Sequence, residues 1–140
     1  MRAQEYLEQI QALQTRIDQK RTLVASLKDK ARGLKGTDTE GIRVQSSKVG
    51  DSMQRMVDAY LDKEQELQDM ILELEFAKTQ IAEEIQSLDD NRFVSLLFKK
   101  YVENKTLLRI SREMHYSYDH VKRLHGWALN DFEHKVLNKN

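Results

Sequence analysis

The sequence predicts an all-α fold, and three observations support that prediction. The 140 residues include no proline, the residue that interrupts helices, and only five glycines. Charged side chains make up 33 % of the chain and hydrophobic ones 39 %, a balance typical of helices with one buried and one solvated face. Apolar residues recur at spacings of three and four over most of the length, which is the periodicity of helices and not of strands.

The composition also argues against several classes of protein. With no cysteine in the chain, neither a disulfide framework nor a cysteine-based zinc site is expected. No stretch of about 18 apolar residues is present, so we expect no transmembrane helix and no membrane partner. The first residues are charged and periodic, unlike a secretory signal, and a cytoplasmic location is therefore expected.

The first 88 residues are expected to form a long antiparallel helical hairpin of coiled-coil type. The first helix ends near Gly33, which can take a left-handed cap. A loop of about residues 34–50 follows, because this stretch is rich in Gly, Thr, Asp and Ser and lacks helical periodicity. The second helix begins at Asp51 or Ser52, either of which can cap it, and runs to the end of this segment.

The register and the wide apolar face of this hairpin lead to two further expectations. Folding at about residue 42 would place Lys20 near Glu64, so that one charged pair interrupts the apolar seam. The second helix carries extra apolar residues beside its seam, among them Val57, Leu61 and Ile71. Two helices cannot cover so wide a face. Either the C-terminal module or a second chain must pack on it, and we favour a homodimer formed through these N-terminal helices.

Residues 89–140 are expected to form a separate domain of three shorter helices, over residues 91–102, 107–114 and 118–136. Thr106 and Ser117 precede the second and third helices and are suited to cap them. His115 lies in the turn between these helices and is a residue type that tolerates positive φ. The small side chain of Ser111 would let the two helices approach. A short helix, a tight turn and a capped second helix form the layout of a helix-turn-helix.

Charge is distributed unevenly along the neutral chain. Residues 1–48 carry a net charge of +4, residues 49–90 carry −9, and residues 91–140 carry +5. A basic C-terminal module beside an acidic helix favours one surface for a polyanion and another for a different partner. The alternative is that these charges are solvated outer faces of helices, and +5 alone is a weak signal for nucleic acid.

A sequence resemblance covers about 40 residues of the C-terminal domain. The run from Tyr101 to Ser117, followed by Val121, Leu124 and Ala128-Leu129, resembles region 4 of sigma-70-type factors, with Asn104 and His115 where that pattern has glycine. The set Tyr116-Ser117, Val121, Arg123, His125-Gly126 and Ala128-Leu129 is similar to small phage and prophage transcriptional regulators of Gram-positive bacteria, of the ArpU and RinA type. These proteins activate late genes.

The resemblance implies sequence-specific binding of double-stranded DNA, in a bacterial host cell, by a recognition helix that begins at Tyr118. The first turn of such a helix faces the base edges of the major groove, which here gives Tyr118, Asp119, His120, Lys122 and Arg123. Arg123 suits a guanine, Lys122 a phosphate, and Asp119 either a cytosine or the helix N-terminus. Phosphate contacts are expected from the cations Lys99, Lys100, Lys105, Arg109 and Arg112, with Ser117 holding the cap.

Other functions were weighed against this one. The four histidines are spaced by five, five and nine residues, which does not place two on one helical face, so no metal and no cofactor are expected. No pattern typical of a catalytic site is present, and we expect no enzyme. A small-terminase-like packaging protein and a module that binds RNA polymerase without reading DNA remain alternatives. Trp127 is expected to be half-buried against the N-terminal half or a dimer partner.

Overall fold

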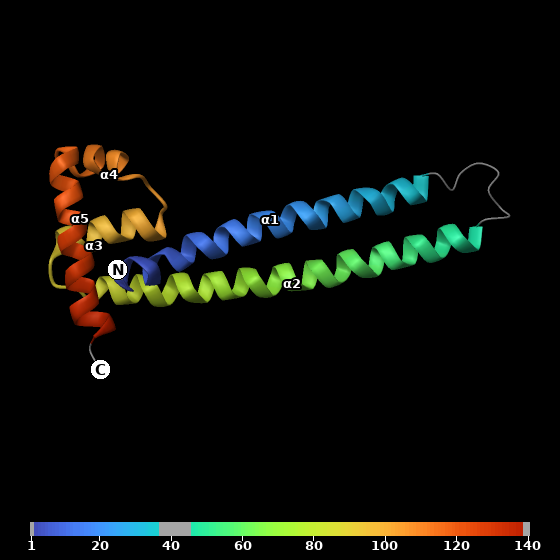
Figure 1. The fold of residues 1–140 in the computed structure, drawn as a ribbon, viewed down its shortest axis with the longest axis horizontal. Coiled ribbons are helices and arrows are strands. Elements are labelled where there is room, and N and C mark those ends of the chain that lie inside the picture. The colour runs from blue at the N-terminus through green and yellow to red at the C-terminus, as the bar shows by residue number, and fades with distance from the viewer. Residues whose placement is uncertain (1, 37–45, 139–140) are drawn as a thin grey trace. The chain divides into compact units, whose positions relative to one another are not determined.

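The computed structural model describes residues 2–36 and 46–138, and it confirms the all-α prediction (Figure 1). No strand occurs in these residues. None of their helices is long and apolar enough to cross a membrane. The elements in chain order are α1 (Arg2–Gly36), α2 (Ser46–Gln86), α3 (Asn91–Leu97), the π-helical turn η3 (Phe98–Val102), α4 (Leu107–Met114), α5 (Tyr118–Phe132) and the π-helical turn η4 (Glu133–Leu137).

The two long helices extend further than the sequence indicated. Gly33 does not end α1, which continues to Gly36. Helix α2 already begins at Ser46, so neither Asp51 nor Ser52 is its N-cap. A single glycine costs a helix only about 1 kcal/mol relative to alanine, which a long helix tolerates. The loop expected over 34–50 is therefore shorter at both ends, and its middle lies outside the described residues.

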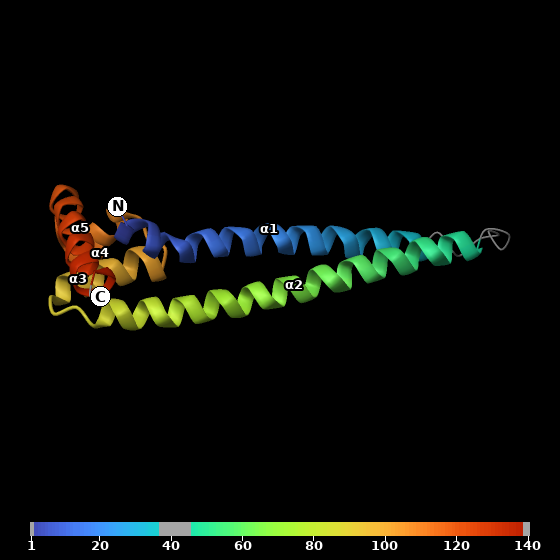
Figure 2. The same cartoon turned by 60° about the horizontal axis from the view of Figure 1, so that its bottom comes forward.

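The described residues divide into two compact units, one of which comprises Gln14–Glu73. Here the second part of α1 and the first part of α2 lie side by side and antiparallel (Figure 2). Lys20 Nζ lies 3.0 Å from Glu66 Oε1, and Lys28 Nζ lies 3.2 Å from Glu64 Oε1. The buried apolar residues of this unit are Ile17, Val24, Ala31 and Leu67, and those on α1 recur every seven residues, as in a coiled coil.

The ion pair expected between Lys20 and Glu64 does not form, because each residue pairs with a different partner. Lys20 contacts Glu66 and not Glu64, whereas Glu64 contacts Lys28. Residues two apart on a helix differ by about 200° in direction, so Glu64 and Glu66 point to opposite edges of α2. Each carboxylate then meets the lysine of α1 on its own edge. All four side chains stay partly exposed, and such pairs contribute little to stability.

The second unit combines the start of α1 up to Leu13 with the chain from Leu74 onward. Its fully buried side chains come from every element but η3 and η4 and include Leu7, Ile10, Ile81, Ile85, Leu96, Leu97, Ile110, Val121, Leu124 and Phe132. Tyr6 joins two of these elements, since its hydroxyl donates to Glu84 Oε1 at 2.5 Å and its ring lies 6.0 Å from that of Phe132. Burial, followed by the bond to Glu84, raises the pKa of Tyr6 to about 12.

The boundaries of these two compact units differ from the single domain boundary expected at residue 88. The first turns of α1 and the last turns of α2 pack with the C-terminal helices in one core. The assignment of oligomerisation to residues 1–88 and of DNA binding to residues 89–140 stays a prediction.

Candidate nucleic-acid interface

Helices α4 and α5 are joined by a tight turn that His115 makes possible. His115 has φ 61° and ψ 38°, in the left-handed region expected for it. The Tyr116 N–H donates to the Ser111 carbonyl at 3.0 Å and the His115 N–H to the Arg112 carbonyl at 3.4 Å. These are the two hydrogen bonds of a Schellman motif, which satisfies carbonyls at a helix end. The chain therefore leaves α4 in a defined direction.

Side-chain caps fix the beginning of both helices. The Thr106 hydroxyl accepts from the Arg109 N–H at 3.1 Å, and the Ser117 hydroxyl accepts from the His120 N–H at 3.1 Å. Both caps and the bounds of α4 agree with the sequence prediction. Ser111 is buried, as its place between the helices requires, and its hydroxyl donates to the Leu108 carbonyl at 2.6 Å. Helix α5 packs on both α3 and α4.

The first turn of α5 carries a small cluster of exposed side chains. Lys122 Nζ lies 4.8 Å from the centroid of the Tyr118 ring and 3.6 Å from Asp119 Oδ1. All three residues are exposed. The ring and the carboxylate hold the ammonium group beside the helix start, a cation–π arrangement of modest strength at an exposed site.

Arg112 on α4 and Arg123 on α5 are exposed and have no ion pair or hydrogen-bond partner for their side chains within the described residues. His120 differs from them because its ring is half-buried and lies edge-on to Tyr116, with centroids 4.8 Å apart. Its ring also lies 6.4 Å from that of Trp127, which is 50 % exposed. The Trp127 ring thus lies near the ring of another residue of α5, and about half of its side chain remains exposed.

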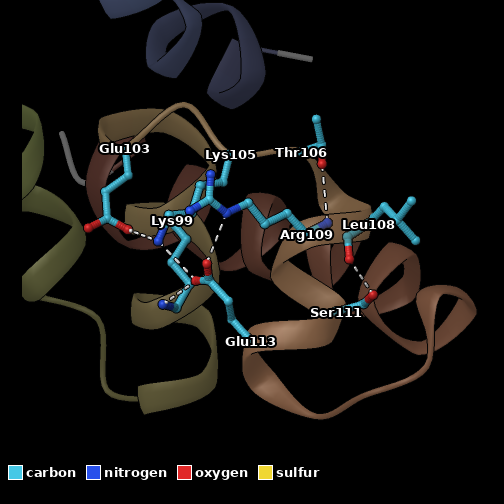
Figure 3. A network of polar contacts seen from close by, with 8 residues as sticks. All are labelled: Lys99, Glu103, Lys105, Thr106, Leu108, Arg109, Ser111 and Glu113. Carbon is cyan, nitrogen blue, oxygen red and sulfur yellow. Dashed lines mark hydrogen bonds and ion pairs between the residues drawn. The ribbon is translucent and has the colours of Figure 1, made fainter.

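Three of the other cations predicted to touch phosphate form a network around Glu113 (Figure 3). Lys99 Nζ and Lys105 Nζ each lie 2.9 Å from Glu113 Oε1, and Arg109 Nε lies 3.1 Å from Glu113 Oε2. Lys105 also lies 3.1 Å from Glu103. Hydrogen bonds from Lys99, then Lys105 and Arg109, lower the pKa of Glu113 to about 2.

The structure thus groups six of the predicted binding residues into two sets. Tyr118, Asp119 and Lys122 lie together at the start of α5. Lys99, Lys105 and Arg109 lie together around Glu113. Lys100 belongs to neither, since its ammonium group lies 5.6 Å from the Tyr101 ring centroid. Sequence reasoning missed Glu113, although the spacing of four from Arg109 on one helix was a signal for an ion pair.

A second polar contact joins η3 to α5, through Tyr101 and His125. The Tyr101 hydroxyl and His125 Nε2 are 2.7 Å apart, and Tyr101 is buried. Burial, assisted by the charge of Lys100, lowers the pKa of His125, while burial raises that of Tyr101. Both rings therefore stay neutral near pH 7. No group of three or more His, Asp or Glu side chains in the described part of the chain is placed to hold a metal ion.

Comparison of the chain with models of known families, with curated proteins and with solved structures gives no match. What the chain does must therefore be inferred from its own residues.

Proposed function

We propose that this chain is a sequence-specific regulator of transcription that binds double-stranded DNA through a helix-turn-helix formed by α4 and α5. The observation that carries the proposal is the turn at His115. A left-handed residue, a Schellman motif and the Ser117 cap occur in a row, at the places where the sigma-70 region 4 pattern has glycine and serine. A polar, capped helix leaving such a turn suits the major groove.

A second detail of the backbone supports the same proposal. Asn104 and His115 are the non-glycine residues with positive φ in the described part of the chain, at 57° and 61°. They occupy the two positions at which the pattern has glycine. Glycine is common there because it adopts positive φ without steric cost. The two turns of this chain therefore have the backbone conformation that glycine favours in the pattern, even though the residues differ.

The arginines without carboxylate partners give the proposal its contacts. Arg123 lies near the start of α5, and we propose that it reaches a base edge. Arg112 lies on α4, and its proposed contact is a phosphate. Similarity to ArpU- and RinA-type proteins makes phage or prophage genes, and late genes in particular, the proposed targets.

Selection from a random duplex library at about 150 mM salt tests the proposal, because purely electrostatic binding is already weak there. We expect one short motif to be enriched, and Arg123→Ala to lose it. Arg55→Ala is the matched control, since Arg55 is an exposed arginine on α2. Recovery without a motif, equal for the wild type and Arg123→Ala, would refute sequence-specific binding.

A module that binds a protein such as RNA polymerase is the second candidate, and exposed Trp127 favours it. Tryptophan is enriched among the residues that dominate protein interfaces. Charge reversal of Lys122 and Arg123 separates the two candidates. The double variant loses binding if DNA is the partner, whereas Trp127→Ala has the larger effect if a protein docks there.

We also propose that residues 1–88 form a hairpin that joins two copies of the chain. Within Gln14–Glu73 the exposed apolar residues Leu23, Leu61 and Leu72 support a further contact. Sedimentation of the wild type should give the mass of a dimer, and Leu72→Glu should give a monomer. A monomeric wild type would refute this arrangement, and a ring-sized mass would favour the packaging alternative.

A further inference from the structure

Glu113 collects cations from three parts of the C-terminal unit. Lys99 comes from η3, Lys105 from the turn before α4, and Arg109 from the previous turn of α4 itself. The side chains of Lys99 and Lys105 are only 28 % and 19 % exposed, whereas Arg109 is 66 % exposed. Figure 3 shows all three reaching one carboxylate.

Removing the carboxylate of Glu113 would affect the three cations differently. Lys105 would keep Glu103 at 3.1 Å, so it stays paired. Lys99 and Arg109 have no other carboxylate partner among the described residues. Loss of the Glu113 charge would therefore release two cations, and loss of both carboxylates would release three.

We infer that Glu113 is a positioning and specificity residue that withholds Lys99, Lys105 and Arg109 from phosphate and so limits how strongly the unit binds any polyanion. Among the described residues of α4 and α5, Arg112 and Arg123 are then the arginines without a carboxylate partner. The inference rests on the proposed DNA-binding function for its biological meaning. Its physical content concerns polyanions of any sequence and is tested separately.

The expected size follows from counterion release. Each phosphate neutralised by a cation contributes about 0.9 to the slope of log K against log salt. Glu113→Gln keeps the shape of the side chain and should steepen this slope by about 1.8, for two released cations. The double variant Glu103→Gln/Glu113→Gln should steepen it by about 2.7.

The experiment measures binding of the full chain to heparin and to a short mixed-sequence duplex over a series of salt concentrations. Glu103→Gln is the matched control, because it removes the same charge while Lys105 keeps Glu113. Its slope should equal that of the wild type. Equal slopes for Glu113→Gln and Glu103→Gln, or no binding by Glu113→Gln, would overturn the inference.

A second comparison does not depend on how well Glu113→Gln folds. In the wild-type background Lys99→Met should leave the salt dependence unchanged. Arg112→Met should make the slope shallower by about 0.9. Equal losses for the two variants would show that Lys99 is not withheld and would overturn the inference.

These outcomes are distinct from failure of the proposed function. If the wild type enriches no DNA motif but Glu113→Gln binds heparin with the steeper slope, the inference stands and the regulator proposal falls. If the wild type reads a motif and Glu113→Gln has an unchanged slope, the regulator proposal stands and the inference falls.

Discussion

Replacing His115 by glycine should stabilise the C-terminal unit. His115 holds φ 61° and ψ 38°, a conformation that costs an L-residue about 1–2 kcal/mol. Its side chain is exposed and makes no hydrogen bond, ion pair or ring contact within the described residues, so no contact is lost. Glycine removes the steric cost but adds about 0.5–1 kcal/mol of backbone entropy to the unfolded chain. The net expected gain is about 0.5–1 kcal/mol.

Urea unfolding followed by the fluorescence of Trp127, the single tryptophan of the chain, measures this gain. Because denaturant slopes for small proteins are about 1–3 kcal/mol per molar urea, the midpoint should rise by about 0.2–1 M. His115→Ala is the control, since alanine keeps the left-handed cost and should give no increase. If His115→Gly were no more stable than His115→Ala, the left-handed turn would not be a source of strain and the reasoning would be refuted.

Three further predictions concern the same unit. Phe132→Ala should cost about 3–5 kcal/mol, because the ring is fully buried against Tyr6 and leaves a cavity; a urea midpoint close to that of the wild type would contradict this core. Lowering the pH should destabilise the fold as it passes below about 6.5 toward the depressed pKa of His125, since the unfolded state then binds the extra proton. His125→Gln should flatten that dependence in urea midpoints measured between pH 5 and 8, and an equally steep profile would assign it to other groups. Ser117→Ala should cost about 1 kcal/mol through loss of the cap on α5, whereas Ser117→Asp should retain most of the stability; equal losses in thermal melts would count against the cap.

The local structure of the C-terminal helices was predictable because short-range chemistry decides it. Thr106 and Ser117 cap the helices that the sequence assigns to them. A hydroxyl directly before an amphipathic stretch lies within reach of the free N–H groups of the first helical turn. His115 adopts positive φ where a turn was needed. These features depend on neighbours within four residues along the chain, which a sequence displays directly.

Two features were missed, one of them local and the other dependent on long-range packing. Helix α1 passes Gly33, although the local sequence favours a stop there. The sequence placed Leu7 and Phe132 in different domains, yet both are fully buried within one unit. In that unit Tyr6 lies beside Phe132, a contact between residues far apart in the sequence, which neither periodicity nor a cap signal records.

The candidate site shows the same limit for charged groups. The sequence identified Lys105 and Arg109 as cations on the expected side of a helix-turn-helix, but it could not show that one carboxylate holds both. Lys99, fourteen residues before Glu113, reaches the same carboxylate because the chain turns between η3 and α4. Only the spacing of Arg109 from Glu113 was visible in advance.

Net charge is therefore a poor measure of what this unit offers to a polyanion. Residues 91–140 carry +5, yet carboxylates hold most of the cations described there, namely Arg92, Lys99, Lys105, Arg109, Lys122 and Lys135. A surface with few free cations binds duplex DNA weakly when the sequence is wrong. A regulator must find a few sites among many competitors, so the ratio of specific to non-specific affinity matters more than affinity itself. Pairing most cations internally would leave that ratio to the base contacts proposed for α5, and Glu113 is the residue whose removal should lower it.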